Sequence, residues 1–446
     1  MIRLKETIIE GDYLVTCNPE NQILKEAAVY VVDGRIHSIG TKAEIHKDYS
    51  SSKVIDGRNK ILLPGLINTH SHSVQTLLRG KADDLSLLDW LSKVILPGEL
   101  NFSEQDVYLS CLLGFAEMIR TGTTAANDML TTHNSEKGFE AVIDSGIRAR
   151  TGKMLMDINQ DFPDTEVESA DVVIEKAIRH IETYHGSENN RIKSSLNARF
   201  LLSCSPKLMK LIVDTQQQYS DLMIHTHASE SKAECKKVKE IFGKSYIRAL
   251  KDIGALGSKT IVAHGIWLDE EEYRIVKETN TRISHNPSSN CKLASGICDV
   301  QKYLEMGVIV GLATDGAPCN NNLDMFNEIR LATFLQKVKH LNEKALPAQQ
   351  ILRMATIDGA RAINWDHEIG SIEEGKKADL IQVDISGINA IPLYDPVSHL
   401  VYSASGKDVS TVIVDGKILY QDNVLTTVDI GKITKEVKKY QEKWTD

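Results

Sequence analysis

The middle of the chain repeats one pattern, in which a short apolar run ends in polar residues and is followed by a longer stretch with helical periodicity. This alternation is typical of a parallel sheet, because parallel strands need a crossover connection between them. The runs recur at intervals of roughly 20–40 residues, and about eight such units close a barrel. We therefore predict an α/β fold with a (β/α)8 barrel of the TIM type. The runs include ILLPGLINTH, LNARFLLSCS, DLMIHTHAS, KTIVAHG, TRISHNP and VIVGLATDG.

Two β hairpins are predicted near the two ends of the chain. AAVYVVDGRIHSIG alternates apolar and polar residues around Asp33-Gly34, and STVIVDGKILY does so around Asp415-Gly416; Asp-Gly between such runs is a strong hairpin signal. We expect residues 1–63 and 366–446 to form one small composite β-sandwich domain, with the barrel of residues 64–365 inserted between them. The two ends should therefore meet in space. The last stretch, ITKEVKKYQEKWTD, is predicted to be a surface helix.

Charge narrows the choice of partners. Lys and Arg number 52 and Asp and Glu 61, so the formal net charge of the 446-residue chain is −9, and no dense basic run occurs. Nucleic-acid and membrane-surface binding both need a positive patch. We therefore expect no nucleic-acid or membrane partner and a small-molecule substrate.

The compartment follows from the cysteines and the N-terminus. The seven cysteines include no Cys-x-x-Cys pair and no regular spacing, so they do not indicate a disulfide framework. Acidic residues interrupt the N-terminus, and no apolar run reaches the roughly 18 residues of a membrane span. We expect a cytoplasmic protein, and a symmetric homo-oligomer as the common state of such chains.

Polar residues cluster where the apolar runs end. In a (β/α) barrel the carboxyl ends of all strands open into one mouth, which holds the active site. We therefore expect these side chains to meet there: His70, His72, Arg199, Phe200, His225, His227, Glu230, His264, His285 and Asp315.

His70 and His72 favour a metal site. Residues two apart on a strand point to the same face, so both imidazoles can bind one cation. An imidazole from His227 and a carboxylate from Asp315 would complete the set and leave a position open for water, as a catalytic zinc requires. His225, on the same predicted strand as His227, is the competing ligand.

Two further residues are candidates for proton transfer. Glu230 comes three residues after His227, close enough to take a proton from an activated water and to pass it to a leaving amine. The alternative is a surface glutamate at the start of a helix, where acidic residues are favoured. His264 could stabilise the attacked ring or the hydroxide, or be an ordinary histidine at a strand end.

The motifs PGLINTHSH, HTHASE, VAHG, HNPSSN and ATDGA resemble, in this order, the amidohydrolase superfamily over nearly the whole chain. Without a bridging lysine they are most similar to its mononuclear aminohydrolase branch. This branch contains methylthioadenosine/S-adenosylhomocysteine deaminases, guanine deaminase and triazine hydrolases. The resemblance implies one zinc or iron on His70, His72, His227 and Asp315, with Glu230 as proton shuttle and His264 near the hydroxide.

The resemblance gives mixed indications of the substrate. Trp90 and Glu99 match positions for a purine ring and for substrate hydroxyls, although Trp90 could equally be a core residue. Lys153 stands where the S-adenosylhomocysteine enzymes carry an arginine, and a lysine lacks the planar fork that binds a carboxylate. The Arg199 position carries a histidine in those enzymes. In contrast, Gln75, Arg199 and Phe200 match base-binding positions of guanine deaminase.

We therefore predict hydrolytic deamination of an aminated purine-type ring. The favoured substrate is a 5′-modified adenosine such as methylthioadenosine, 5′-deoxyadenosine or S-adenosylhomocysteine, followed by guanine and then by a triazine. Hydrolysis of a cyclic amide is a more distant alternative, and a non-catalytic barrel is another. The zinc deaminases of flipped bases are excluded, because the His-x-Glu and Pro-Cys-x-x-Cys signature is absent. Cys319 is either a pocket residue or a core residue.

Overall fold

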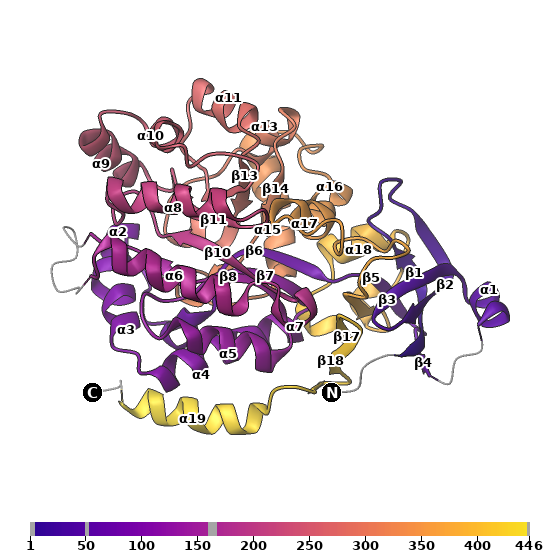
Figure 1. Cartoon of the computed structure of the whole chain (residues 1–446). Coiled ribbons are helices and arrows are strands. Elements are labelled where there is room, and N and C mark those ends of the chain that lie inside the picture. Colours follow the sequence, from indigo (N-terminus) through magenta and orange to yellow (C-terminus); the bar gives the residue numbers. More distant parts are fainter. Residues whose placement is uncertain (1–4, 50–52, 159–166, 444–446) are drawn as a thin grey trace.

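The computed structural model describes residues 5–49, 53–158 and 167–443. Within them the strands form two sheets, one of ten strands and one of nine. Figure 1 shows the larger sheet surrounded by helices and the smaller one beside it. The predicted α/β architecture, with a parallel barrel-like sheet and a second domain built from both chain ends, is confirmed.

The ten-stranded sheet is parallel and curls until its ends meet. β14 pairs with β13 on one side, and β15, which follows it directly in the chain, pairs with β6 on the other. The strands are buried almost throughout, as expected where helices cover the outside of a parallel sheet. They are β6 (Leu66–His72), β7 (Thr123–Met129), β8 (Arg148–Gly152), β9 (Met154–Leu155), β10 (Ile192–Ala198), β11 (Met223–Ala228), β12 (Thr260–His264), β13 (Arg282–His285), β14 (Val310–Leu312) and β15 (Asp315–Gly316).

Helices cover this sheet and begin at recognisable caps. Ser103, Ser231 and Asp269 each start a helix with a capping box, in which the cap and a carboxylate three residues later bond each other's backbone amides. The longer helices are α4 (Glu104–Arg120), α5 (Ser135–Ser145), α6 (Ala170–Tyr184), α8 (Pro206–Gln218), α9 (Lys232–Phe242), α10 (Tyr246–Ile253), α11 (Glu270–Glu278) and α15 (Met325–His340). Shorter ones are α7 (Ser187–Asn190), α12 (Pro287–Lys292), α13 (Val300–Glu305), α14 (Ala317–Asn320), α16 (Ala348–Met354) and α17 (Ile357–Ala362).

The nine-stranded sheet is mixed and takes strands from both ends of the chain. β5 of the N-terminal part pairs antiparallel with β16 of the C-terminal part, and this pairing joins the two halves. The sheet encloses its own apolar core, which includes Ile9, Val29 and Ile413. Its strands are β1 (Glu6–Val15), β2 (Ile23–Val32), β3 (Arg35–Thr41), β4 (Val54–Ile55), β5 (Lys60–Pro64), β16 (Leu380–Asp384), β17 (Val409–Val414), β18 (Lys417–Gln421) and β19 (Val424–Leu425). A short helix, α1 (Lys42–Asp48), follows β3.

The two predicted hairpins exist, and their turns touch. Asp33-Gly34 connects β2 to β3 and Asp415-Gly416 connects β17 to β18, all with positive φ as such tight turns require. A Cβ atom on Gly34 would lie 2.7 Å from the carbonyl oxygen of Asp415. The expectation that the two ends meet therefore agrees with the structure.

The C-terminal segment returns to the barrel. α18 (Pro396–Tyr402) precedes β17, and the predicted surface helix is α19 (Ile430–Lys443). α19 lies against α4 (Figure 1), and the ring of Tyr440 contacts that of Phe102 at 5.8 Å between centroids. Among the described helices, none combines the length and apolar character needed to cross a bilayer.

Candidate active site

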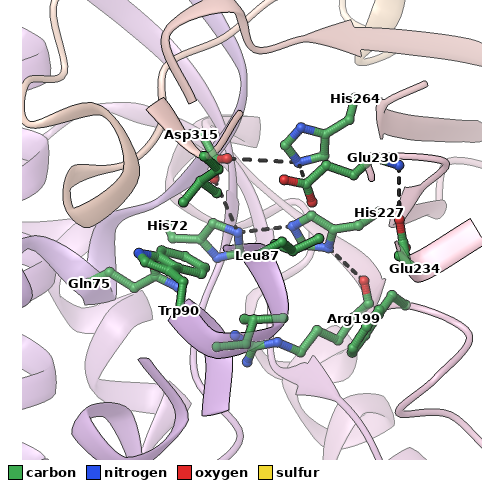
Figure 2. Close-up of a pocket in the computed structure, with 13 residues that line it drawn as sticks. His72, Gln75, Leu87, Trp90, Arg199, His227, Glu230, Glu234, His264 and Asp315 are labelled. Atoms are coloured by element: carbon green, nitrogen blue, oxygen red, sulfur yellow. Dashed lines mark hydrogen bonds and ion pairs between the residues drawn. The ribbon is translucent and has the colours of Figure 1, made fainter. Parts of the chain in front are cut away.

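A cavity of about 410 Å³ opens at the carboxyl ends of the barrel strands (Figure 2). It brings together residues from β6, β11, β12, β15 and the loops that follow them. The predicted substrate-binding residues Gln75, Arg199 and Phe200 line it. Three predicted metal ligands and the predicted proton-transfer residues Glu230 and His264 line it as well. The lining residues are His72, Gln75, Leu87, Trp90, Leu91, Arg199, Phe200, His227, Glu230, Glu234, His264, Leu293 and Asp315.

His70 lies below the lining of this cavity, and its imidazole contacts the imidazole of His225. The two ring nitrogens, Nδ1 of His70 and Nε2 of His225, are 2.8 Å apart. The other nitrogen of His225 lies 3.1 Å from the Asn127 amide nitrogen, so His225 has neither nitrogen free for a cation. Nε2 of His70 is buried and has no hydrogen-bond partner. The structure therefore assigns His225 to orienting His70 rather than to ligation, which the sequence left open.

His72 and His227 face each other across the same space. Their rings are nearly parallel, and the two Nε2 atoms are 3.2 Å apart. Nδ1 of His227 lies 2.6 Å from the Arg199 carbonyl oxygen, to which it donates its hydrogen. The Nε2 lone pair of His227 therefore points toward His72, an arrangement that a cation between them would stabilise.

Asp315 supplies the carboxylate of this cluster. Its Oδ1 lies 3.3 Å from Nε2 of His70 and 3.6 Å from Nε2 of His72. The Ser289 hydroxyl donates to Oδ2 at 2.7 Å. Burial acts to raise the pKa of Asp315, but His70, His264 and His72 hold it well below its usual value, so the carboxylate is charged at neutral pH.

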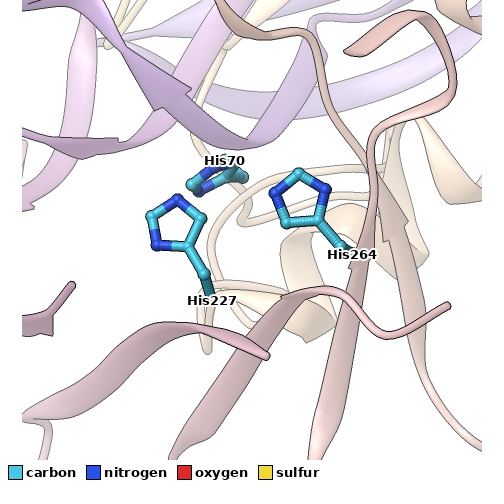
Figure 3. Close-up of side chains that lie close together, drawn as sticks. All are labelled: His70, His227 and His264. Atoms are coloured by element: carbon cyan, nitrogen blue, oxygen red, sulfur yellow. The ribbon is translucent and has the colours of Figure 1, made fainter. Parts of the chain in front are cut away.

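These residues form a His/Asp metal site. Possible ligand atoms of His70, His72 and Asp315 all lie within 4.8 Å of one another, as do those of His70, His227 and His264 (Figure 3). Burial, followed by the charges of neighbouring histidines, lowers the pKa of His72 and His227 well below 6.5. Neutral imidazoles and a charged carboxylate are the protonation states that bind zinc.

Glu230 is buried beside the metal site. Its Oε2 lies 3.5 Å from Nε2 of His264, and the Ser295 hydroxyl donates to its Oε1 at 3.2 Å. Burial, and then the charge of Asp315, raises the pKa of Glu230 to about 8. Its backbone amide donates to Glu234 at 2.9 Å, which fixes the turn out of β11. This carboxyl group can hold or release a proton near neutral pH.

His264 is oriented by Asn290 and carries backbone strain. Its Nδ1 donates to the Asn290 carboxamide oxygen at 2.8 Å, so Nε2 faces Glu230 and Asp315. His264 has φ 75° and Asp315 has φ 62°, a left-handed conformation that is uncommon outside glycine. Such strain persists where the surrounding structure enforces it, which is typical of active sites.

A buried polar chain forms the wall opposite the metal site. Gln75 donates its amide nitrogen to Glu99 at 2.8 Å, and the Arg199 guanidinium lies 3.5 Å from the other Glu99 oxygen. All three side chains are buried. The Gln75 amide oxygen has no partner and is available to a ligand.

The helical turns after β6 cover the cavity. η1 (Ser73–Leu78), α2 (Leu87–Trp90), the π-helical η2 (Leu91–Ile95) and α3 (Leu96–Leu100) follow in sequence, and π-helical turns occur frequently at functional sites. The Trp90 indole N–H is buried without a partner in the cavity wall. An unpaired buried donor of this kind indicates a ligand contact more than a core position.

Several predicted candidates are not among the residues that line the cavity: His70, Glu99, Lys153, His225, His285 and Cys319. Lys153 is buried in a neighbouring cleft, where its Nζ lies 3.4 Å from Glu168. Cys319 is fully buried and donates to the Gly316 carbonyl. It does not line the cavity, so the structure places it in the core.

The residues that orient His264 and Glu230 were not predicted from the sequence. Asn290 is the last residue of the HNPSSN motif and Ser295 follows it, and their polar types at a barrel mouth were the available signal. Glu234 was predictable, because Ser231 and Glu234 have the spacing of a capping box. The apolar contacts of Leu87, Leu91 and Leu293 had no recognisable signal.

The comparisons with known proteins agree with this geometry. The model of the amidohydrolase family matches residues 61–419. The chain belongs to the amidohydrolase family. This confirms the family predicted from the motifs.

Three similar proteins cover almost the whole chain. The 5′-deoxyadenosine deaminase of Methanosarcina mazei is 39% identical over 440 residues, which cover 98% of each protein. The 5-methylthioadenosine/S-adenosylhomocysteine deaminase of Carboxydothermus hydrogenoformans is 40% identical over 420 residues, 94% of this chain and 93% of that protein. An adenosine deaminase from Xanthomonas campestris, solved with bound zinc, has a TM-score of 0.93 and 30% identity, with 98% of each chain covered.

Proposed function

We propose that this protein is a metal-dependent hydrolytic deaminase of 5′-modified adenosines. The observation that carries the proposal is the buried Glu230 carboxyl beside His264 and the His/Asp metal site, all facing one cavity. Full-length similarity to deaminases of 5′-deoxyadenosine and of methylthioadenosine and S-adenosylhomocysteine supports the substrate class.

One zinc ion would be held by His70, His72, His227 and Asp315, whose donor types and protonation states fit it. A divalent cation there lowers the pKa of water toward 7 and so supplies a hydroxide at neutral pH. His225 and the Arg199 carbonyl orient two of the ligands, as hydrogen-bonding partners of metal-bound histidines commonly do.

Glu230 moves the protons of the reaction. It takes a proton from the water whose oxygen attacks the ring carbon that bears the amine, and a tetrahedral intermediate results. The same carboxyl then gives that proton to the amine, the carbon–nitrogen bond breaks and ammonia leaves. The proton of the added hydroxyl moves to the adjacent ring nitrogen, which gives the oxo-purine. The Ser295 hydroxyl and the backbone contact to Glu234 hold Glu230 in place, while His264 faces the attack site through Nε2.

The opposite wall would bind the nucleoside. The free oxygen of Gln75 and the free N–H of Trp90 offer one acceptor and one donor. Phe200 provides an aromatic surface, and Glu99 with Arg199 provides charged groups that hydroxyls can pair with. A buried set of polar groups discriminates strongly against ligands that leave them unpaired.

Ammonia release from the zinc-loaded protein tests the proposal. The panel consists of 5′-deoxyadenosine, methylthioadenosine, S-adenosylhomocysteine, guanine and melamine, with Glu230→Gln as control. We expect turnover of the 5′-modified adenosines and its loss in the control. Turnover of guanine alone would contradict the nucleoside assignment and make Gln75 and Arg199 the base-reading residues. Silence on the whole panel with zinc bound would contradict the deaminase assignment.

A further inference from the structure

A second cleft adjoins the catalytic cavity. It is open to solvent, and its walls include Leu100, Lys153, Met156 and Glu168. Leu100 directly follows Glu99, and the carbonyl of Leu155, the residue before Met156, accepts the backbone amide of Arg199. Glu99 and Leu155 both contact Arg199, which lines the cavity, so the cleft lies next to the cavity on the side of Arg199.

A buried lysine in this cleft is neutralised by the chain itself. The Lys153 side chain is 3% exposed, and its Nζ lies 3.4 Å from Oε2 of Glu168. The other Glu168 oxygen contacts Nζ of Lys176. Burial lowers the pKa of Lys153, while the Glu168 charge opposes that shift. A cation this deeply buried needs an anion beside it, and Glu168 is that anion.

Two neighbouring basic side chains also lie close to carboxylates of the chain. On α6, Arg179 contacts Glu175 at 3.1 Å and His180 lies 3.9 Å from Glu136. These groups line the adjoining outer cleft together with Lys153 and Lys176. Glu168 pairs with both Lys153 and Lys176, so it already neutralises the cations that an anionic ligand in the inner cleft would contact.

We propose that Glu168 is an internal counterion that makes this chain selective for adenosines with an uncharged 5′ group. The inference rests on the proposed function and names its substrate class more closely. A methyl or methylthio group leaves the Lys153–Glu168 pair intact. A 5′ group ending in a carboxylate has to displace Glu168 or lie beside its like charge, and a like charge brought close is a source of specificity.

A matched pair of substrates tests this. Methylthioadenosine and its 5′-carboxymethylthio analogue differ by one carboxylate, and S-adenosylhomocysteine adds an ammonium. We expect the wild-type protein to have a higher kcat/KM for methylthioadenosine than for either charged compound. In Glu168→Gln, the ratio of kcat/KM for the carboxymethylthio analogue to that for methylthioadenosine should rise about tenfold.

Two further variants locate the effect. Adding Lys153→Met to Glu168→Gln should abolish the gain, because no lysine would remain at this position to attract the substrate carboxylate. Glu175→Gln removes an exposed carboxylate from α6, the helix that follows Glu168, and should leave the ratio at its wild-type value.

Three outcomes would overturn the inference. The first is an unchanged ratio in Glu168→Gln at an unchanged melting temperature, which leaves the deaminase assignment intact. The second is an equal gain with and without Lys153. The third is wild-type kcat/KM for S-adenosylhomocysteine that matches that for methylthioadenosine, because the ion pair would then accommodate a zwitterion. If no adenosine is deaminated at all, the proposed function fails and the inference with it.

Discussion

The two ends of the barrel both bury charged groups, but they do so in opposite ways. At the floor, Arg148 donates twice to Asp379 of the terminal sheet, at 2.7 and 3.0 Å. Arg150 and Lys193 share Asp221, and all three cations lie over the Trp365 ring. The cations of this floor cluster therefore each have a carboxylate partner within the fold.

At the mouth, several buried polar atoms have no partner. They belong to His70, His72, Gln75, Trp90 and Asn290. Because an unpaired buried polar atom is costly, its retention needs an explanation such as an ion or a substrate. Unpaired atoms also occur elsewhere, for example at Arg282 at the start of β13, so what distinguishes the mouth is that several of them face one cavity together with a His/Asp cluster.

The carboxyl groups repeat this contrast. Burial raises the pKa of Glu230 to about 8 and those of Glu234 and Glu328, which support the mouth, to about 7. At the floor, burial acts in the same direction, but Arg150 and Lys193 hold the pKa of Asp221 below its usual value. The floor keeps Asp221 charged, whereas at the mouth Asp315 is charged but Glu230, Glu234 and Glu328 can exchange protons near neutral pH.

The largest effect is expected when Glu230, the acid at the mouth, is replaced by glutamine, which has nearly the same shape. Glu230→Gln should lower kcat by about 10³-fold, because a positioned acid–base group contributes about 10²–10⁴-fold. Steady-state kinetics on 5′-deoxyadenosine measures the loss, and elemental analysis should find the wild-type zinc content. A kcat within tenfold of wild type would remove Glu230 from proton transfer.

Removing a charged partner at the floor should instead lower the free energy of unfolding. Arg148→Met leaves the buried Asp379 unpaired and should lower the free energy of unfolding by about 3–5 kcal/mol. Urea unfolding measures it, and kcat per folded molecule should remain at the wild-type value. Arg179→Met, which removes an exposed arginine, should cost little. Equal losses in both variants would contradict the special role of the floor pair.

His225 lies at the mouth, but both of its ring nitrogens have hydrogen-bond partners. Its replacement therefore tests whether it orients a metal ligand. His225→Asn should weaken zinc binding by about 10–100-fold through loss of the orientation of His70. Competition against a chelator measures this. His399, a buried histidine on α18, provides the control, since His399→Asn should leave zinc affinity unchanged. Wild-type affinity in His225→Asn would refute the orienting role.

The smallest effect is a pH dependence of stability. The native pKa of Glu328 is about 7, above its ordinary value of 4.5, so the native state keeps a proton that the unfolded chain has lost between these pH values. The free energy of unfolding should therefore fall as pH rises from about 4.5 to about 7, and Glu328→Gln should remove on the order of 1 kcal/mol of this fall.

Urea unfolding at pH 5 and pH 7.5 compares the two proteins. The control is Asp221→Asn, which should leave the difference between pH 5 and pH 7.5 unchanged, because the lowered pKa of Asp221 confines its titration to pH values below about 3.8. Parallel pH profiles of wild type and Glu328→Gln would contradict the raised pKa.

The parts of the molecule that follow from local sequence pattern were predictable. The Asp-Gly turns, the alternation of strands and helices and the histidines at strand ends give the architecture, and the structure brings His70, His72, His227 and Asp315 together. The orienting contacts of His225 and Asn290 were not predictable, because they depend on side-chain directions across different strands. Glu168 could not be found either, since it meets Lys153 only through the position of α6 relative to β8.

The contact between Gly34 and Gly416 dictates an order of events during synthesis. The first hairpin leaves the ribosome early, but the turn on which it rests is among the last segments to be translated. The edge of β5 likewise waits for β16. The nascent protein must therefore carry an unpaired strand edge while the barrel forms, and such edges promote aggregation. Closing the terminal sheet is thus the step that removes this exposed edge.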